Sequence, residues 1–109
     1  MLFIDVEDFF NKVGALPPLN RDEEKSLAQR MASGDENARK ALIESRLPLA
    51  ASYVRRLPKE MQTLKAVYSL IEAVEKGVDS FNFLQESETF NHHLSWRLRQ
   101  CITRLIAER

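Results

Sequence analysis

Apolar residues recur every three or four positions along most of this chain, and no stretch of useful length alternates apolar and polar residues as a strand would. The chain has only three glycines and four prolines, and most of them fall where helices should end. This periodicity predicts an all-α domain of about five helices around one core. The expected helices lie between Asp5 and Gly14, over 21–33, between Asp35 and Leu57, over 59–76, and from Ser87 to the end of the chain.

Particular residues mark where these helices should start and stop. Asn20, followed three residues later by Glu23, is typical of a capping box. Pro48 lies inside the third helical segment, where it removes an amide donor, so we expect a kink or a break beside it. Gly77 is expected to close the fourth helix, and residues 78–86 are expected to form a loop.

The apolar stripes of these segments predict the core. Two phenylalanines in the expected loop, Phe81 and Phe83, should pin that loop to the core. The apolar arc of the last helix also includes Ile106. The residues predicted to lie inside are Phe9, Leu27, Leu42, Leu64, Ile71, Leu98, Ile102 and Leu105.

Charge is balanced in total but not along the chain. The 16 basic and 16 acidic side chains cancel, which argues against a protein that coats DNA without specificity. Counting by segment, residues 1–36 carry a net charge of −4 and residues 37–60 a net charge of +4. Residues 61–96 then carry −3 and residues 97–109 carry +3. The pattern therefore predicts two basic surfaces on a neutral protein.

Several function classes find no support in the residues. The single cysteine, Cys101, cannot form an internal disulfide, and the acid at Asp5 comes too early for a signal peptide. With no apolar run near the roughly 20 residues that span a bilayer, we expect a soluble cytoplasmic protein. His92 and His93 are adjacent and point about 100° apart on a helix, so they should not share a metal. Without a phosphate loop or a paired nucleophile and base, we expect no enzyme, cofactor, metal or small-molecule substrate.

The last helix has one residue that packing does not explain. Trp96 falls on the arc opposite the apolar one, among polar and cationic neighbours. An exposed aromatic between arginines is a suitable platform for stacking single-stranded bases. The alternatives are partial burial of Trp96 beside Phe81 and Phe83, and a merely solvated face for each arginine. The residues of this arc are His92, His93, Trp96, Arg97, Arg99, Gln100, Thr103 and Arg104.

Five runs of residues, in their order and spacing, match a known family. They are Asp5-Val6-x-x-Phe9-Phe10-x-x-Val13-Gly14; Pro18-Leu19-x-x-x-Glu23-Glu24-x-x-Leu27-Ala28-x-Arg30; Gly34-Asp35-x-x-Ala38-x-x-x-Leu42-Ile43-Glu44-x-x-Leu47-x-Leu49 with Arg55-Arg56; Leu70-Ile71-Glu72-Ala73-Val74-Glu75-Lys76; and Phe90 and Trp96 with Arg99-Gln100-x-Ile102-Thr103-Arg104-x-Ile106-Ala107. The chain resembles the sigma-70 family of bacterial transcription factors. Residues 1–36 are similar to conserved region 1.2, and residues 37–109 are similar to region 2.

The resemblance implies a bundle like that of sigma region 2 and a role for each residue of the polar arc. Trp96 would stack against the separated base at the edge of the melted promoter. Gln100 and Thr103 would approach the upstream −10 base pair. The resemblance implies that Arg99 and Arg104 contact backbone phosphate. It also implies that His92 and His93 take the place of a pair that helps to hold flipped bases. Arg97 stands where the family has the second of two tryptophans.

The stretch that resembles the polymerase-binding segment departs from the family. Residues 61–66 carry no acid and one lysine, where the family has acids and a glutamine facing the polymerase clamp. The two acids in residues 84–89 would repel phosphate, and the chain stops after region 2, without a helix-turn-helix for the −35 element. We therefore expect weakened or altered binding to core polymerase. The residues expected on that surface are Met61, Gln62, Lys65, Ser69 and Glu72.

Two functions follow from the residues and the resemblance. The first is a transcription-initiation domain whose last helix contacts the single-stranded non-template strand of the −10 element. The second is a degenerate sigma-like domain that regulates transcription by protein–protein contact. The arc around Trp96 favours the first, and the missing acids of residues 61–66 favour the second.

Overall fold

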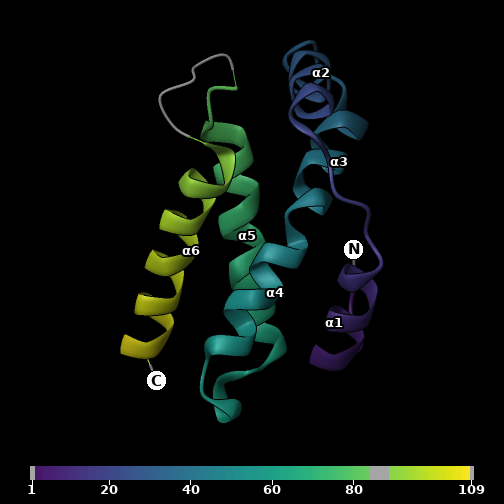
Figure 1. The fold of residues 1–109 in the computed structure, drawn as a ribbon. Coiled ribbons are helices and arrows are strands. Elements are labelled where there is room, and N and C mark those ends of the chain that lie inside the picture. Colours follow the sequence, from purple (N-terminus) through teal and green to yellow (C-terminus); the bar gives the residue numbers. More distant parts are fainter. Residues whose placement is uncertain (1, 84–88, 109) are drawn as a thin grey trace.

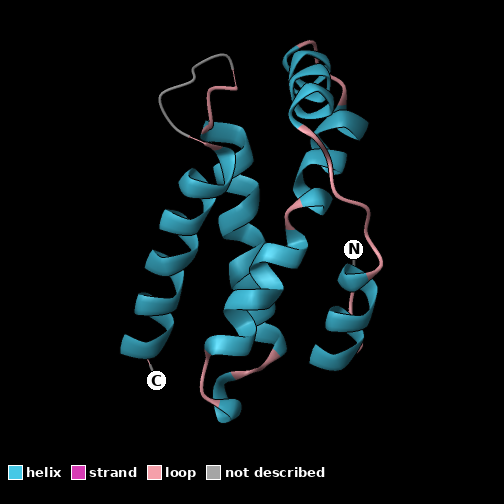
Figure 2. Cartoon of the chain, viewed as in Figure 1, coloured by secondary structure: helices cyan, strands magenta, loops and turns pink. Residues whose placement is uncertain are grey.

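The chain folds into helices joined by short turns in the computed structural model, which describes residues 2–83 and 89–108. Within these ranges there is no strand, and no helix is long and apolar enough to cross a membrane (Figure 2). The all-α prediction is confirmed. The helices are α1 (Val6–Gly14), α2 (Arg21–Ala32), α3 (Glu36–Ser45), α4 (Leu47–Arg56), the 3-10 turn η1 (Lys59–Met61), α5 (Leu64–Ser80) and α6 (Phe90–Ala107).

Polar side chains close the first turn of most of these helices. At the start of α2, the Asn20 side chain accepts from the Glu23 amide at 2.8 Å, and the Glu23 carboxylate accepts from the Asn20 amide at 3.1 Å. This reciprocal pair confirms the predicted capping box. Gly34, with φ of +94°, follows α2 in the left-handed region, as a helix-ending glycine does. The other side-chain caps are Asp5, Asp35, Thr63 and Thr89.

The third predicted segment is two helices. Helix α3 ends at Ser45, and α4 begins at Leu47 with Pro48 in its first turn. Proline is tolerated there because the first amides of a helix have no intrahelical acceptor. Arg46, between the two helices, has non-helical backbone angles. The break predicted beside Pro48 is therefore confirmed.

The predicted fourth helix is wrong at both ends. Residues 59–61 form only the turn η1, and α5 starts at Leu64 after its cap Thr63. Helix α5 also continues through Gly77 to Ser80. Gly77 faces α6, where a Cβ atom at this position would lie 2.3 Å from Cδ2 of Leu94. The glycine thus allows close packing of two helices and does not end one.

As a consequence, residues 78–80 are helical and not part of the expected loop. The rest of that loop, and the predicted start of the last helix at Ser87, fall partly on residues 84–88, which lie outside the described residues. The last helix is described from Phe90. Phe83 is buried and Phe81 packs against the core, so the two rings hold the start of this connection as predicted.

Helix α5 is the centre of the bundle. It packs against α6 on one side and against α4, α3 and α1 on others, while α2 packs on α3 (Figure 1). Of the predicted core residues, Phe9, Leu42, Leu98 and Leu105 are buried. The other predicted core residues are half-buried against this core: Leu27, Leu64, Ile71 and Ile102. Ile106 is 40% exposed, which corrects its assignment to the buried arc of the last helix.

Candidate nucleic-acid interface

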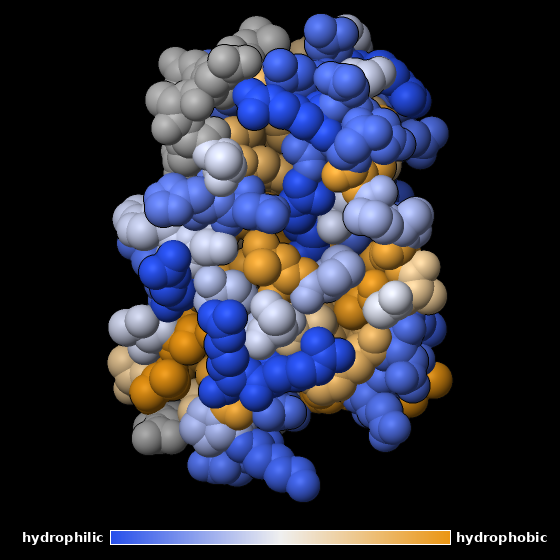
Figure 3. All heavy atoms as spheres, viewed as in Figure 1, coloured by the Kyte–Doolittle hydropathy of each residue, from blue (hydrophilic) through white to orange (hydrophobic). Residues whose placement is uncertain are grey.

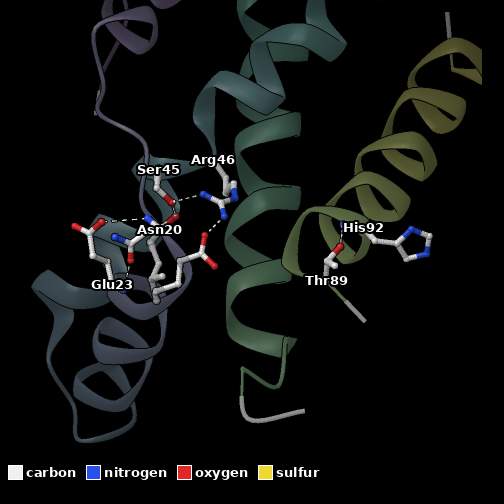
Figure 4. A network of polar contacts seen from close by, with 8 residues as sticks. Asn20, Glu23, Ser45, Arg46, Thr89 and His92 are labelled. Atoms are coloured by element: carbon white, nitrogen blue, oxygen red, sulfur yellow. Dashed lines mark hydrogen bonds and ion pairs between the residues drawn. The ribbon is translucent and has the colours of Figure 1, made fainter. Parts of the chain in front are cut away.

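Helix α6 lies at the edge of the bundle and presents one face outward (Figure 1). The Thr89 hydroxyl accepts from the His92 amide at 3.1 Å and so caps this helix (Figure 4). Its apolar residues recur every three or four positions and fix which face turns to the core. The buried ones are Phe90, Leu94, Leu98, Cys101 and Leu105.

On the outward face, the Trp96 side chain is 56% exposed. An open concavity of about 390 Å³ surrounds it. Burial of Trp96 beside Phe81 and Phe83, the alternative left open by the sequence, is not observed, because those rings pack on each other and on Phe90. The concavity is lined by Trp96, Arg99, Gln100, Thr103, Arg104 and Ala107.

Arg99 turns toward α4. It lies near the hydroxyl of the buried Tyr53, as does Ser95. The Arg56 guanidinium lies 4.6 Å from the centre of the Tyr53 ring. Burial alone would raise the pKa of Tyr53, but the contacts with Ser95 and Arg99 and the charges of Arg99 and Arg56 hold it below its usual value. Tyr53 thus links the basic end of α4 to the outward face of α6.

Arg97 and Arg104 turn the other way, toward α5. Together with Gln100 they line a groove of about 180 Å³ between the two helices. Glu72 and Lys76 of α5 form an exposed ion pair of 2.9 Å on its far side. The hydrogen bond from Lys76, followed by the charges of Lys76 and Arg104, lowers the pKa of Glu72. We call this the α5–α6 groove; its lining is Ser69, Glu72, Ala73, Lys76, Arg97, Gln100, Cys101 and Arg104.

The two histidines do not form a pair. His92 is exposed at the start of α6. His93 is half-buried, with Nε2 3.1 Å from the Ser80 hydroxyl and its ring 5.2 Å from that of Phe81. His93 therefore ties the start of α6 to the end of α5, and His92 alone points into solvent.

The predicted polymerase-binding residues lie in three places. Ser69 and Glu72 belong to the α5–α6 groove, next to residues predicted for DNA. Met61 and Lys65 line a separate depression of about 180 Å³ beside the end of α6. The Gln62 amide donates to the Leu57 carbonyl at 3.0 Å, so it closes the end of α4 and is not held out for a partner.

A further concavity of about 350 Å³ lies between α2 and the start of α6. Arg46, labelled in Figure 4, forms an ion pair with Glu24 at its floor, and both side chains are mostly buried. The Arg46 guanidinium also lies 4.8 Å from the Phe90 ring centre, and burial lowers its pKa. The sequence alone did not predict this pair, although Glu24 shares a helical face with the apolar Leu27 and Met31, which indicates that it points inward.

The described residues offer neither a reactive cysteine nor a cluster of metal ligands. Cys101 is buried, and burial raises the pKa of its thiol, which keeps it in the unreactive neutral form. Among residues 2–83 and 89–108, no three His, Cys, Asp or Glu side chains gather as a metal site would need. On the face shown in Figure 3, hydrophilic side chains cover much of the surface, and apolar surface shows between them. The chemistry offered by the outward face of α6 is therefore stacking, hydrogen bonding and charge.

Comparison with known proteins points to one family. The profile described as sigma-70 factor, region 1.2, matches residues 6–37. RNA polymerase sigma factor SigA of Clostridium acetobutylicum is 35% identical over 104 residues, which is 94% of this chain and 27% of that protein. The SigA proteins of a Bacillus species and of Listeria monocytogenes are 34% and 32% identical, again over 94% of this chain, and it covers 27% and 28% of them. The chain thus spans little more than a quarter of the length of these relatives.

Proposed function

Since this chain belongs to the sigma-70 family of RNA polymerase sigma factors, we propose that it is a transcription-initiation domain that contacts the −10 promoter element through α6. The observation that carries the proposal is the 56% exposure of Trp96 in a concavity otherwise lined mainly by cationic and polar side chains. An exposed ring beside arginines can stack an unpaired base of the non-template strand. The function is one of binding, without catalysis or a cofactor.

The neighbours of Trp96 can divide the remaining work. Gln100 is exposed and offers both a donor and an acceptor to a base edge. The Thr103 hydroxyl donates to the Arg99 carbonyl at 3.0 Å, so only its lone pairs remain to accept from a base. Arg99 and Arg104 flank the ring as partners for phosphate. Of the two histidines, the exposed His92 is the better candidate for a flipped base.

Binding to core polymerase would be weak or altered. Lys65 is exposed on α5 and places a positive charge where the resemblance to the family implies an acid. Gln62 is held by the end of α4. A basic clamp surface would therefore meet neither an acid nor a free amide at these two positions. The same observation supports a second candidate function, regulation of transcription by protein–protein contact.

The two parts of the chain would act as one body at the promoter. Helix α1, from the part similar to region 1.2, packs on α4 and α5, and α2 packs on α3. Residues 1–36 would thus brace residues 37–109 and not form a separate unit. Action on chromosomal promoters also implies a cytoplasmic location.

Fluorescence anisotropy with a labelled single strand of −10-like sequence tests the DNA contact. The Trp96→Ala variant lacks the ring on which one base would stack. It should bind about 5- to 150-fold more weakly, which corresponds to roughly 1–3 kcal/mol. The slope of log affinity against log salt should hardly change, because no charge is removed. Emission from Trp96, the single tryptophan, should respond when the strand is added.

The exposed Tyr68 on α5 provides a matched control, because Tyr68→Ala removes an aromatic ring outside the concavity. This variant should bind the strand as the natural chain does. If the natural chain does not bind at low salt and Trp96 emission is unmoved, the DNA contact is refuted. If the natural chain then captures core polymerase, regulation by protein–protein contact becomes the favoured function.

A further inference from the structure

The α5–α6 groove contains two arginines whose charges are not neutralised by an ion pair within residues 2–83 and 89–108. Arg97 is half-buried, and its Nε atom has no hydrogen-bond partner in the described part of the chain. Arg104 is exposed and lines the groove together with Cys101. A guanidinium left in this state favours an anion that can accept two parallel hydrogen bonds.

Packing, and not an anion, sets the course of the Arg97 side chain. The absence of a side chain at Gly77 lets α6 approach α5 closely. A Cβ atom at residue 77 would lie 3.4 Å from Cδ of Arg97, so the stem of the arginine runs across the glycine. The guanidinium is thereby directed along the groove before any ligand arrives, which reduces the entropy lost on binding.

The charges that face the groove favour an anion. Lys76, Arg97 and Arg104 are positive and Glu72 is negative, which leaves a net charge of +2. Glu72 is 63% exposed and already paired with Lys76 at 2.9 Å. Its charge is therefore largely neutralised at the rim, while the two arginines lie on the α6 wall.

The groove borders the concavity around Trp96. Gln100 and Arg104 line both the α5–α6 groove and the concavity around Trp96. A group bound between the two arginines is thus next to whatever stacks on the indole ring. Of the common anions, the phosphodiester of a nucleic-acid strand is the one that carries a base beside it.

We propose that the α5–α6 groove binds one backbone phosphate of the single strand whose base stacks on Trp96, with Arg97 and Arg104 as its donors. The inference rests on the proposed DNA contact and extends it to a site built from α5 as well as α6. It gives Arg97, which stands where the family has a tryptophan, a phosphate as its partner and not a base.

The test combines a protein variant with a modified strand. Anisotropy titrations at several salt concentrations use −10-like single strands in which one linkage at a time is a neutral methylphosphonate. For the natural chain, one such linkage next to the stacked base should lower the salt slope by about 0.7, the value for one phosphate of a single strand. Arg97→Gln should lower the slope of the unmodified strand equally, so its affinity falls about 2.6-fold less between 50 and 200 mM salt. Combining the two changes should add little, because they remove the same contact.

Two charge variants serve as controls. Lys40→Gln removes one positive charge from α3, outside the groove, and should leave the slope unchanged. Glu72→Gln removes the one negative charge of the groove and should strengthen binding. Thermal unfolding followed by circular dichroism checks that each variant is folded. If Arg97→Gln is not, Arg104→Gln enters the same cycle, since Arg104 is exposed.

The outcomes separate this proposal from the one on which it rests. If Trp96→Ala weakens binding while Arg97→Gln leaves the slope unchanged, the phosphate site is refuted and the DNA contact stands. Additive effects of Arg97→Gln and every single methylphosphonate would also refute it, because the arginine would act only through net charge. Absence of any binding by the natural chain overturns both. Loss of polyglutamate binding in Arg97→Gln, with DNA binding intact, would assign the groove to an acidic protein segment instead.

Discussion

Gly77 of α5 packs directly against Leu94 of α6, because a Cβ atom at residue 77 would lie 2.3 Å from Leu94 Cδ2. Leu94 is fully buried, so it has little room to move away. The two residues therefore set the spacing of α5 and α6, and with it the shape of the α5–α6 groove.

Gly77→Ala should destabilise the domain despite the better helix propensity of alanine. Propensity favours alanine by about 1 kcal/mol in a helix interior, whereas overpacking of a filled core costs about 1–3 kcal/mol. We expect a net loss of about 1 kcal/mol in the free energy of unfolding by denaturant. Gly14→Ala is the control, since nothing lies within 4 Å of its Cβ position and its backbone is helical. It should be neutral or slightly stabilising; equal losses in both variants would show that Leu94 is not the cause.

The buried pair of Glu24 and Arg46 should be sensitive to the loss of one partner and tolerant of the loss of both. Arg46→Met leaves the Glu24 carboxylate buried without its cation, at a cost on the order of 3 kcal/mol. Replacing both residues by apolar ones of similar size should restore most of this stability. Urea unfolding of the two single variants and the double variant measures the difference. Additive losses would contradict a direct ionic contact.

Much of this fold follows from local signals. The capping box at Asn20 and the break beside Pro48 depend on a few neighbouring residues, so the sequence alone predicts them correctly. Gly77 was misread because its role depends on Leu94, a residue of another helix. A glycine that ends a helix and one that admits a neighbour look the same within their own segment.

The candidate site shows the same division. Helical phase was enough to predict that Trp96 faces outward. The phase also placed Arg97 and Arg99 on one polar face, but packing turns Arg97 toward α5 and Arg99 toward Tyr53 of α4. This role of Tyr53 could not be predicted, because neither the sequence of α4 nor that of α6 shows that these two helices pack side by side.

The pair of Arg39 and Asp79 should make the stability of the fold depend on pH in the acidic range. It joins α3 to α5 with two hydrogen bonds of 2.8 and 2.9 Å. The hydrogen bond from Arg39 lowers the pKa of Asp79. A lowered pKa in the folded state adds stability above the ordinary aspartate pKa of about 3.9, and this stability disappears as pH falls through the folded-state value. Asp79→Asn should therefore lower Tm at pH 7 and approach the natural chain at pH 3. A constant difference across this range would contradict the assignment.

Tyr53→Phe should weaken the DNA contact without unfolding the domain. The change removes the hydroxyl that lies near Arg99 and keeps the ring beneath Arg56. Loss of a polar interaction comparable to one hydrogen bond costs about 0.5–1.5 kcal/mol, so we expect a fall in affinity of about 2- to 10-fold. The salt slope should stay the same because Arg99 remains present. Tyr68→Phe, which changes a hydroxyl that accepts from the Phe3 amide far from α6, is the control for general effects of the substitution.

The weak polymerase binding that we propose should be reversed most directly at Lys65. The family pattern would place a glutamine and an acid at residues 64 and 65, but Leu64 packs against the core and cannot become polar without loss of stability. Lys65 is exposed, so Lys65→Glu changes the local charge by two units and leaves the fold intact. Capture of core polymerase by this variant should exceed capture by the natural chain, and the gain should shrink at high salt because it is electrostatic. Lys40→Glu makes the same charge change on α3 and should give no gain. Tight, salt-insensitive capture by the natural chain would instead mean that its neutral surface already fits the polymerase.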